Sequence, residues 1–171
     1  MVVSDPAHSA LDPGALAPTD REHLERAVAL ARGARDRGDH PFGAVLVTAE
    51  GVVVEAMNTV NTGHDPIGHA ETNLVRDAGQ QLELDELAGS TLYTSTEPCA
   101  MCTGAIYWAG IRRIVFALSE GGLREIVGAQ DGVPTLALAS REVLARGGRA
   151  VEVVGPVDLP AATEVHRGFW R

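Results

Sequence analysis

Lysine is missing from this 171-residue sequence. All 14 of its basic residues are arginine, they face 23 acidic residues, and the net charge is −9. A surface of that charge repels polyphosphate, because nucleic-acid binding depends on basic groups that neutralise phosphates. The charge therefore predicts a small-molecule substrate and argues against a nucleic-acid partner.

Long apolar runs are also missing. No stretch approaches the roughly 20 apolar residues that a membrane-spanning helix needs, so we expect no membrane partner. The first residues, MVVSDPAHSALDPG, lack the basic flank and the apolar centre of a secretory signal. By default, these absences predict a cytoplasmic protein.

Cysteine occurs only twice, which excludes a disulfide framework. Cys99 and Cys102 are three positions apart, in the order Cys-Ala-Met-Cys. In a reducing compartment this spacing is typical of a metal-binding pair or a redox pair.

The chain organisation predicts an α/β fold. Residues 1–18 hold three prolines and are expected to form a flexible arm, with one domain over 19–171. Thr19 and Glu22 have the spacing of a helix capping box. The expected strands are 42–48, 52–57, 91–95, 111–118 and 150–154. The expected helices are 19–38, 69–78, 98–110, 123–127, 136–146 and 160–171. Gly79 is expected to end the second helix, and Pro98 to lie early in the third. Strands that alternate with helices predict a three-layer α/β/α sandwich around a mixed sheet of about five strands.

Three residues have the character of zinc ligands. His69 begins one predicted helix, and Cys99 and Cys102 begin another. The positive end of a helix favours thiolates, and a spacing of three residues puts both sulfurs on one side of the first turn. Two thiolates and one imidazole leave a fourth tetrahedral position for water, as in catalytic zinc sites.

Glu71 follows His69 by two residues and is expected to face water rather than the metal. Zinc lowers the pKa of its water toward about 7. A neighbouring carboxylate can take that proton and return it to a ring nitrogen and a departing amine. The four residues together predict a hydrolytic deaminase with one zinc ion per chain.

The pattern His69-Ala70-Glu71 followed by Pro98-Cys99-Ala100-Met101-Cys102 resembles the cytidine deaminase superfamily. The likeness covers roughly residues 20–120 and is to the branch of bacterial guanine deaminases, fungal cytosine deaminases and tRNA adenosine deaminases. It implies a cytidine deaminase-like fold and a homodimer.

The resemblance also implies which residues contact the substrate. The segment 41–45 is similar to the strand that lines the family's pocket, so Phe42 is a substrate-binding candidate. Asn58 falls where the family has an asparagine that contacts the substrate. Ala70 and Trp108 are two further candidates. Bacterial guanine deaminases use a second acidic proton carrier, which corresponds to Asp131 here. The aromatic pair Phe169 and Trp170 could close a pocket, either that of its own chain or that of a partner subunit.

Other interpretations remain open at this point. The cysteines could be a buried or redox pair, or His64 or Asp65 could complete a structural zinc site. Asn58 could be a turn residue, and Phe42 and Trp108 could belong to the core. Among substrates, the sequence favours a free guanine-type purine, then cytosine, a nucleoside or an amino-triazine, and last a tRNA adenosine.

Overall fold

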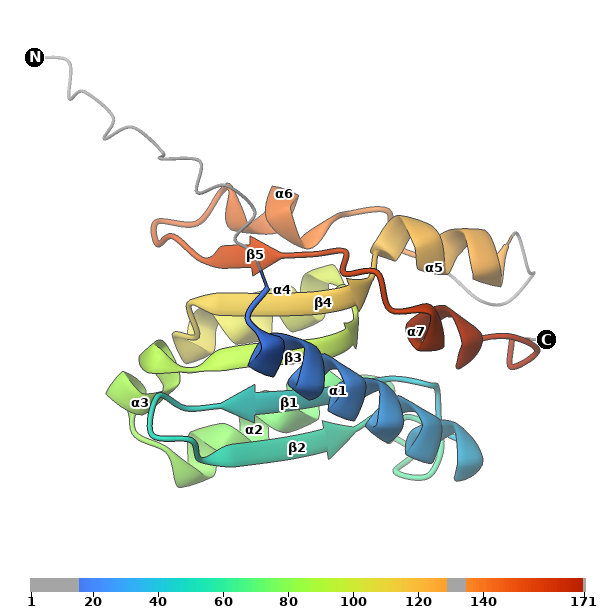
Figure 1. The fold of residues 1–171 in the computed structure, drawn as a ribbon, viewed down its shortest axis with the longest axis horizontal. Coiled ribbons are helices and arrows are strands. Elements are labelled where there is room, and N and C mark those ends of the chain that lie inside the picture. The colour runs from blue at the N-terminus through green and yellow to red at the C-terminus, as the bar shows by residue number, and fades with distance from the viewer. Residues whose placement is uncertain (1–15, 129–134, 171) are drawn as a thin grey trace, which may run out of the picture.

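The computed structural model describes residues 16–128 and 135–170 (Figure 1). Five strands form one sheet in the order β2-β1-β3-β4-β5. Strand β1 pairs antiparallel with β2 and β3, whereas β3, β4 and β5 run parallel. The strands are β1 (Gly43–Val47), β2 (Val53–Met57), β3 (Thr91–Thr96), β4 (Arg113–Leu118) and β5 (Glu152–Val154). The mixed five-stranded sheet is therefore confirmed.

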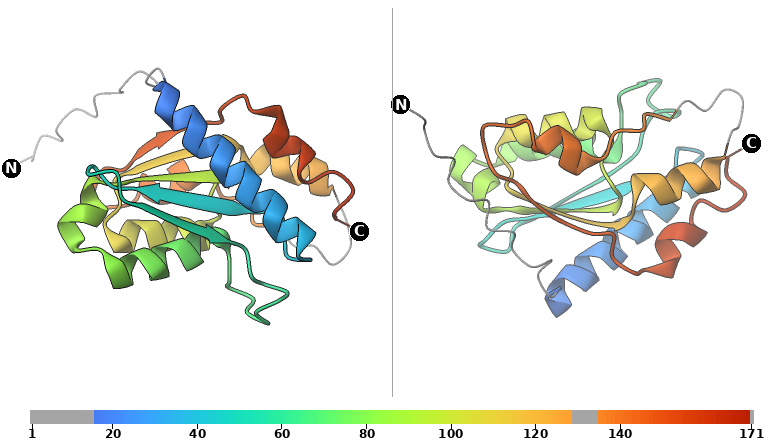
Figure 2. Two further views of the ribbon diagram at one scale, coloured as in Figure 1. Left: turned by 60° about the horizontal axis from the view of Figure 1, so that its bottom comes forward. Right: turned by 90° about the horizontal axis from the view of Figure 1, so that it is seen from above.

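Helices cover both faces of this sheet, as the two views of Figure 2 show. The helices are α1 (Pro18–Asp36), α2 (Ala70–Gln81), α3 (Leu84–Gly89), α4 (Ala100–Ala109), α5 (Glu120–Val127), α6 (Ser140–Leu144) and α7 (Pro160–Glu164). Helices α1 and α7 contribute to the core on one face, and α2, α3, α4 and α6 contribute to the core on the other. The predicted three-layer arrangement is confirmed.

Alternating side chains of the strands divide the core in two. Along β1, Ala44 and Leu46 enter the core beneath α2 and α4, and Val45 enters the core beneath α1. On β3, Leu92 enters the core beneath α2 and α4, and Tyr93 enters the core beneath α1. Because side chains of a strand point alternately to its two faces, an apolar strand of this kind must be covered on both sides.

The start of the first helix differs from the sequence prediction. Helix α1 begins at Pro18 with Ala17 as its N-cap, so Thr19 and Glu22 do not form the capping box. The Asp20 carboxylate instead accepts a hydrogen bond from the Ala17 N–H at 3.0 Å. Proline fits the first helical position because its missing N–H would have no partner there.

Other boundaries were also predicted wrongly. Gly79 lies inside α2, where a substitution would meet open space, and does not end the helix. Pro98 precedes the N-cap of α4, and α3 occupies a stretch that we expected to lack structure. The final helix stops at Glu164, and Gly168 then adopts a left-handed φ of 67°. Short helices near sheet edges depend on tertiary packing, which periodicity does not record.

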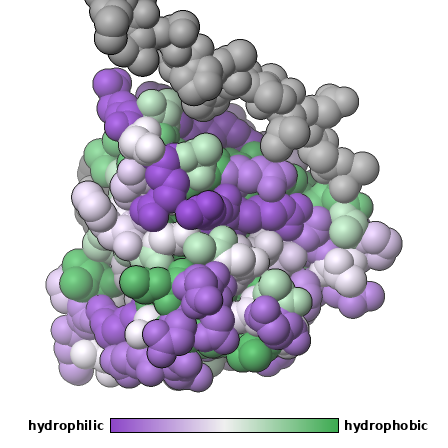
Figure 3. All heavy atoms as spheres, turned by 90° about the vertical axis from the view of Figure 1, so that its left-hand side faces the viewer, coloured by the Kyte–Doolittle hydropathy of each residue, from purple (hydrophilic) through white to green (hydrophobic). Residues whose placement is uncertain are grey.

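Residues 1–15 of the predicted arm lie outside the described ranges, and Leu16 packs against the core beneath α1. None of the helices in the described ranges combines the length and the apolarity that a bilayer span requires. The end of the molecule that carries α3 shows hydrophilic side chains interspersed with hydrophobic ones (Figure 3).

Candidate active site

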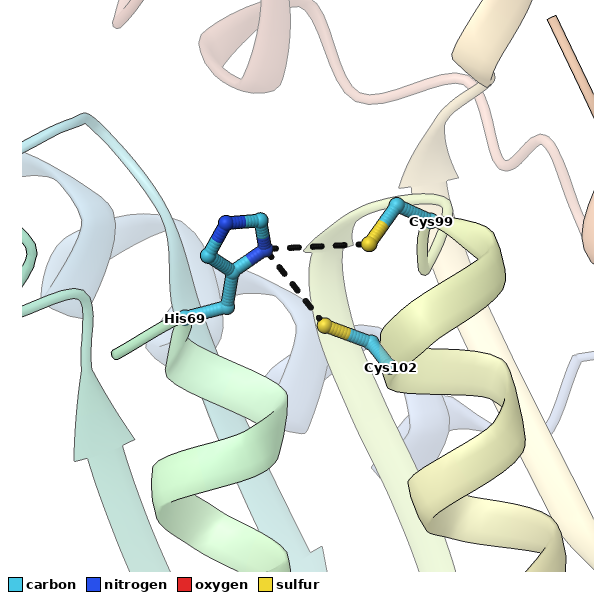
Figure 4. A group of neighbouring side chains, drawn as sticks. All are labelled: His69, Cys99 and Cys102. Atoms are coloured by element: carbon cyan, nitrogen blue, oxygen red, sulfur yellow. Dashed lines mark hydrogen bonds between the residues drawn. The ribbon is translucent and has the colours of Figure 1, made fainter. Parts of the chain in front are cut away.

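Two helix starts bring the candidate ligands together. His69 is the N-cap of α2 and Cys99 is the N-cap of α4, while Cys102 lies in the first turn of α4. Helices α2 and α4 pack beside one another on the same face of the sheet. Figure 4 shows the His69 ring directed at both sulfur atoms.

The distances among these three residues fit a zinc ion. His69 Nδ1 lies 3.7 Å from Cys99 Sγ and 3.5 Å from Cys102 Sγ. Tetrahedral geometry with ordinary Zn–N and Zn–S bond lengths requires a separation of about 3.6 Å between such a nitrogen and sulfur. All three donor atoms lie within 4.8 Å of one another. The donor set and its spacing therefore suit zinc, with Nδ1 as the histidine donor.

The groups around Cys99 favour the thiolate form of its side chain. A hydrogen bond from the Cys102 thiol is the main cause that lowers the pKa of Cys99 to about 4, and His69 lowers it further against the effect of burial. The same shared proton raises the pKa of Cys102. Metal ligands of this type must be deprotonated, so one of the two sulfurs is already in the binding form.

Glu71 lies in the first turn of α2, and its side chain is buried at 4% exposure. Burial raises the pKa of Glu71, and the hydrogen bond from Thr94 opposes that shift. The Thr94 hydroxyl lies 2.6 Å from Glu71 Oε1. A carboxyl group in this position can hold a proton in one state and release it in another.

A cavity of about 520 Å³ opens onto these residues. Its lining includes His69, Glu71 and Cys99, together with Phe42, which is one of the predicted substrate residues. Cavities of this size accept small molecules. Two of the three metal-ligand candidates thus meet Glu71 and Phe42 at one pocket.

Aromatic side chains form one wall of this cavity. His40, Phe42, Phe169 and Trp170 line it and contact one another, with ring centroids 5.1 to 6.0 Å apart. The C-terminal pair therefore lines the pocket of its own chain. Flat aromatic rings offer a stacking surface for a planar heterocycle.

His166 lies behind this wall and is fully buried. Its ring stacks on Trp170 at an interplanar angle of 13°, and its Nδ1 accepts a hydrogen bond from Trp170 Nε1 at 3.4 Å. Nε2 lies 3.3 Å from the Thr96 hydroxyl. Burial lowers the pKa of His166 to about 4, so the ring is neutral near pH 7.

Two further glutamates line the cavity and were not predicted. Glu97 Oε1 accepts hydrogen bonds from the Ser140 N–H and hydroxyl, and Oε2 accepts one from the Glu120 N–H. Burial is the main cause that raises the pKa of Glu120 to about 7, and the charges of Cys99 and Glu97 add to the shift. Both residues follow carboxyl ends of the parallel strands β3 and β4, which is where ligands bind in many α/β sheets.

Three of the predicted substrate-binding residues do not line the cavity. Asn58 is buried, its Oδ1 accepts the Val60 N–H, and its Nδ2 has no hydrogen-bond partner in the described structure. Ala70 belongs to the core beneath α2, and Trp108 is 83% exposed on α4. Asp131 lies outside the described residues. The cavity's tryptophan is Trp170 rather than Trp108.

Comparison with known proteins agrees with this arrangement. The profile of the cytidine and deoxycytidylate deaminase zinc-binding region matches residues 17–118. The "Probable cytosine deaminase" of Schizosaccharomyces pombe is 41% identical over 156 residues, which cover 91% of this chain and 94% of that protein. The guanine deaminase of Bacillus subtilis is 44% identical over 55% of this chain and 61% of its own length.

Solved structures agree as well. NE0047 in complex with 2,6-diaminopurine has a TM-score of 0.70 and 26% identity, and the match covers 88% of this chain and 80% of that one. The family match extends from α1 to the end of β4 and includes all three candidate ligands and Glu71. This chain therefore belongs to the cytidine and deoxycytidylate deaminase family and is a deaminase.

Proposed function

We propose that this chain removes the exocyclic amino group of a free nucleobase by hydrolysis, with a guanine-type purine as its preferred substrate. His69, Cys99 and Cys102 hold one zinc ion per chain, and Glu71 carries the protons. The observation that carries the proposal is the buried Glu71 carboxyl group, which shares one cavity with His69 and Cys99.

In this reaction water enters and ammonia leaves. Zinc, when bound, supplies the Lewis-acid chemistry that makes water a competent nucleophile near neutral pH. Glu71 accepts the first proton that the attacking water loses and passes it to a ring nitrogen of the base. It then takes the second proton from the hydroxyl group now bonded to the ring carbon and delivers it to the departing amine. The Thr94 hydroxyl holds Glu71 Oε1 in place during these transfers.

The pocket favours a flat, uncharged ligand. The rings of Phe42, Phe169 and Trp170 offer a surface on which a heterocycle can stack. The unpaired Asn58 Nδ2 is a donor that a substrate oxygen or ring nitrogen could satisfy, and leaving such a buried donor without a partner costs about 1–3 kcal/mol. This supports a role for Asn58 in substrate binding, for which its buried side chain would have to turn toward the cavity.

Charge argues against a phosphorylated substrate. The described lining of the cavity contains three glutamates and no arginine. A nucleotide or an RNA strand would need cationic groups near its phosphates. A free base has no phosphate and needs no cationic group, so we rank free bases above nucleotides and tRNA as candidate substrates.

Cytosine is the second candidate. It is favoured by the relative from S. pombe, which matches nearly the whole chain and is named a probable cytosine deaminase. Guanine remains first because of the guanine deaminase relative and the 2,6-diaminopurine bound to a structural neighbour.

Ammonia release from a panel of substrates tests the proposal. The panel contains guanine, cytosine, adenine, their nucleosides, ammeline, deoxycytidylate and a tRNA anticodon stem. We expect the highest kcat/KM on guanine, with a KM that changes little between low and high salt. If only deoxycytidylate or only the RNA were turned over, with a KM that rises steeply with salt, the proposed preference for a free base would be overturned.

We also propose that the protein is a homodimer that uses one side of α4. Met101 and Trp108 are exposed, and Gly104 and Ala105 lie between them on the same helical face. Small residues between two large apolar ones allow another helix to approach closely. Sedimentation should give a dimer that Trp108→Glu weakens; a wild-type monomer at high concentration would contradict the dimer.

A further inference from the structure

Glu120 occupies a fixed position at the edge of the cavity. It is the first residue of α5, and its N–H donates to Glu97 Oε2 at 3.0 Å. Two residues later, the Gly122 N–H donates to the Ser119 hydroxyl, also at 3.0 Å. The bond to Glu97 anchors the start of α5 to the segment between β3 and Cys99, and the bond to Ser119 caps the helix. The Cα of Glu120 is therefore held by the same framework that holds the candidate zinc ligand.

The side chain of Glu120 differs from the other two glutamates of the cavity. Glu71 accepts a hydrogen bond from Thr94, and both oxygens of Glu97 are occupied. No described residue donates a hydrogen bond to the Glu120 carboxyl group, which is half-buried in the cavity lining. It is thus the acceptor that a bound ligand can reach.

Among the described residues, the surroundings of Glu120 supply no hydrogen-bond donor to its carboxyl group. Cys99 and Glu97 contribute negative charge, while Leu123 and Val127 of α5 present apolar surface to the cavity. The charge of Arg124, on the next turn of α5, opposes their effect on the pKa of Glu120, but Arg124 is exposed and does not line the cavity. A carboxylate half-removed from water gains most from a ligand that brings its own N–H group.

We propose that Glu120 is a substrate-binding residue that accepts a hydrogen bond from a ring N–H of the base. This inference rests on the proposed function, since it assumes a nucleobase in the cavity. Two ring positions can supply the N–H: the nitrogen beside the reacting carbon, and the nitrogen that carries the sugar in a nucleoside. In the second case Glu120 makes the protein select free bases over nucleosides.

The test compares Glu120→Gln with Glu125→Gln, a matched change at an exposed position of the same helix. A hydrogen bond to a charged acceptor contributes about 1.5–3 kcal/mol, so kcat/KM for guanine should fall about 10- to 100-fold in Glu120→Gln, mainly through KM. Glu125→Gln should behave like the wild type. Glu120→Asp, which keeps the charge but shortens the side chain, should lie between the two.

Methylated bases identify the donor. 9-Methylguanine lacks the N–H at the sugar position, and 1-methylguanine lacks the one beside the reacting carbon. The methyl group that removes the Glu120 partner should lower kcat/KM in the wild type but have little further effect in Glu120→Gln, as expected for two changes to one interaction. If cytosine proves to be the substrate, 1-methylcytosine replaces 9-methylguanine.

The outcomes separate this inference from the proposed function. An active wild type with an equally active Glu120→Gln, or additive effects of the variant and both methyl groups, would overturn the role of Glu120 alone. A zinc-loaded wild type that deaminates no base would overturn the proposed function, and this inference with it.

Discussion

The Thr94 hydroxyl lies between two acceptors, 2.6 Å from Glu71 Oε1 and 3.0 Å from the Thr96 carbonyl oxygen. A hydroxyl group has one proton to donate. When Glu71 is ionised, Thr94 donates to it; when Glu71 holds a proton, Glu71 can donate to the Thr94 oxygen, and Thr94 can donate to the carbonyl. The arrangement therefore accommodates both protonation states of Glu71.

Replacing Thr94 tests this relationship. Thr94→Val keeps the side-chain shape but removes the hydroxyl, so kcat should fall about 10- to 100-fold while zinc content is retained. Thr94→Ser should restore most of the activity because it restores the hydroxyl. Steady-state kinetics with metal analysis would make the measurement. If Thr94→Val kept its kcat, Thr94 would not position Glu71.

Zinc content tests the ligand set. Cys99→Ala, Cys102→Ala and His69→Ala should each purify with far less than one zinc per chain and show no ammonia release, because three protein ligands hold a catalytic zinc ion. His64→Ala is the control, since His64 lies outside the cluster of three donor residues, and it should keep its zinc. Stoichiometric zinc in Cys99→Ala would contradict the assignment.

Asp39 predicts a dependence of stability on pH. Its side chain is fully buried; burial alone would raise its pKa, but bonds from Thr62, Arg37 and Asn61 outweigh this and lower the pKa to about 2. The folded pKa lies below the unfolded value of 3.8, so the stabilisation is present above about pH 4 and is lost as the pH falls toward 2. It amounts to about 2 kcal/mol.

Urea denaturation at several pH values would measure this effect. Asp39→Asn should lower the unfolding free energy by about 2 kcal/mol at pH 7 and flatten its decline between pH 4 and 3. Asp36→Asn, at an exposed neighbouring site, should change neither. KM should also rise in Asp39→Asn, because Asp39 holds the Asn61 segment that lines the cavity.

His166 is expected to position Trp170. The Trp170 indole N–H can only donate, so His166 Nδ1 accepts and Nε2 carries the proton toward Thr96. His166→Phe keeps a ring in the buried space but loses both bonds, and KM should rise about 2- to 10-fold with little change in kcat. The matched control is His23→Phe, whose ring packs on Tyr93 away from the cavity.

Fluorescence gives a second measure of the same change. In a Trp108→Phe background, Trp170 is the one tryptophan left of the two in the sequence. Its emission should shift to longer wavelength when His166 is replaced, because the indole becomes more exposed to water. An unchanged emission maximum together with an unchanged KM would show that His166 merely fills space.

The sequence predicted the fold and the metal cluster because both rest on local signals. Runs rich in strand-forming residues predict β1 and β3, and His69 and Cys99 stand where helices begin. The cluster then follows from two helix starts at one edge of the sheet. Spacing within short segments was sufficient for each step.

The pocket could not be predicted in the same way. Its aromatic wall joins His40 before β1 to Phe169 and Trp170 near the C-terminus, a pairing that depends on where α7 docks. Trp108 was predicted to bind substrate because it follows the cysteines in sequence, yet its position on α4 turns it outward. The sequence suggested that Trp170 could close a pocket, but could not say whose pocket it was. Glu97 and Glu120 meet only because β3 and β4 are parallel neighbours.

The most direct test of the account is Glu71→Gln, measured for zinc content and ammonia release in the same preparation. Glutamine keeps the size of the side chain and can still accept from Thr94, but it cannot carry a proton as a carboxylate does. We expect about one zinc ion per chain, an unchanged fold and a loss of turnover on guanine of at least about 1000-fold, as expected for removal of an essential proton carrier. Retained turnover, or loss of the zinc, would contradict the assignment of Glu71 as a proton carrier that does not bind the metal.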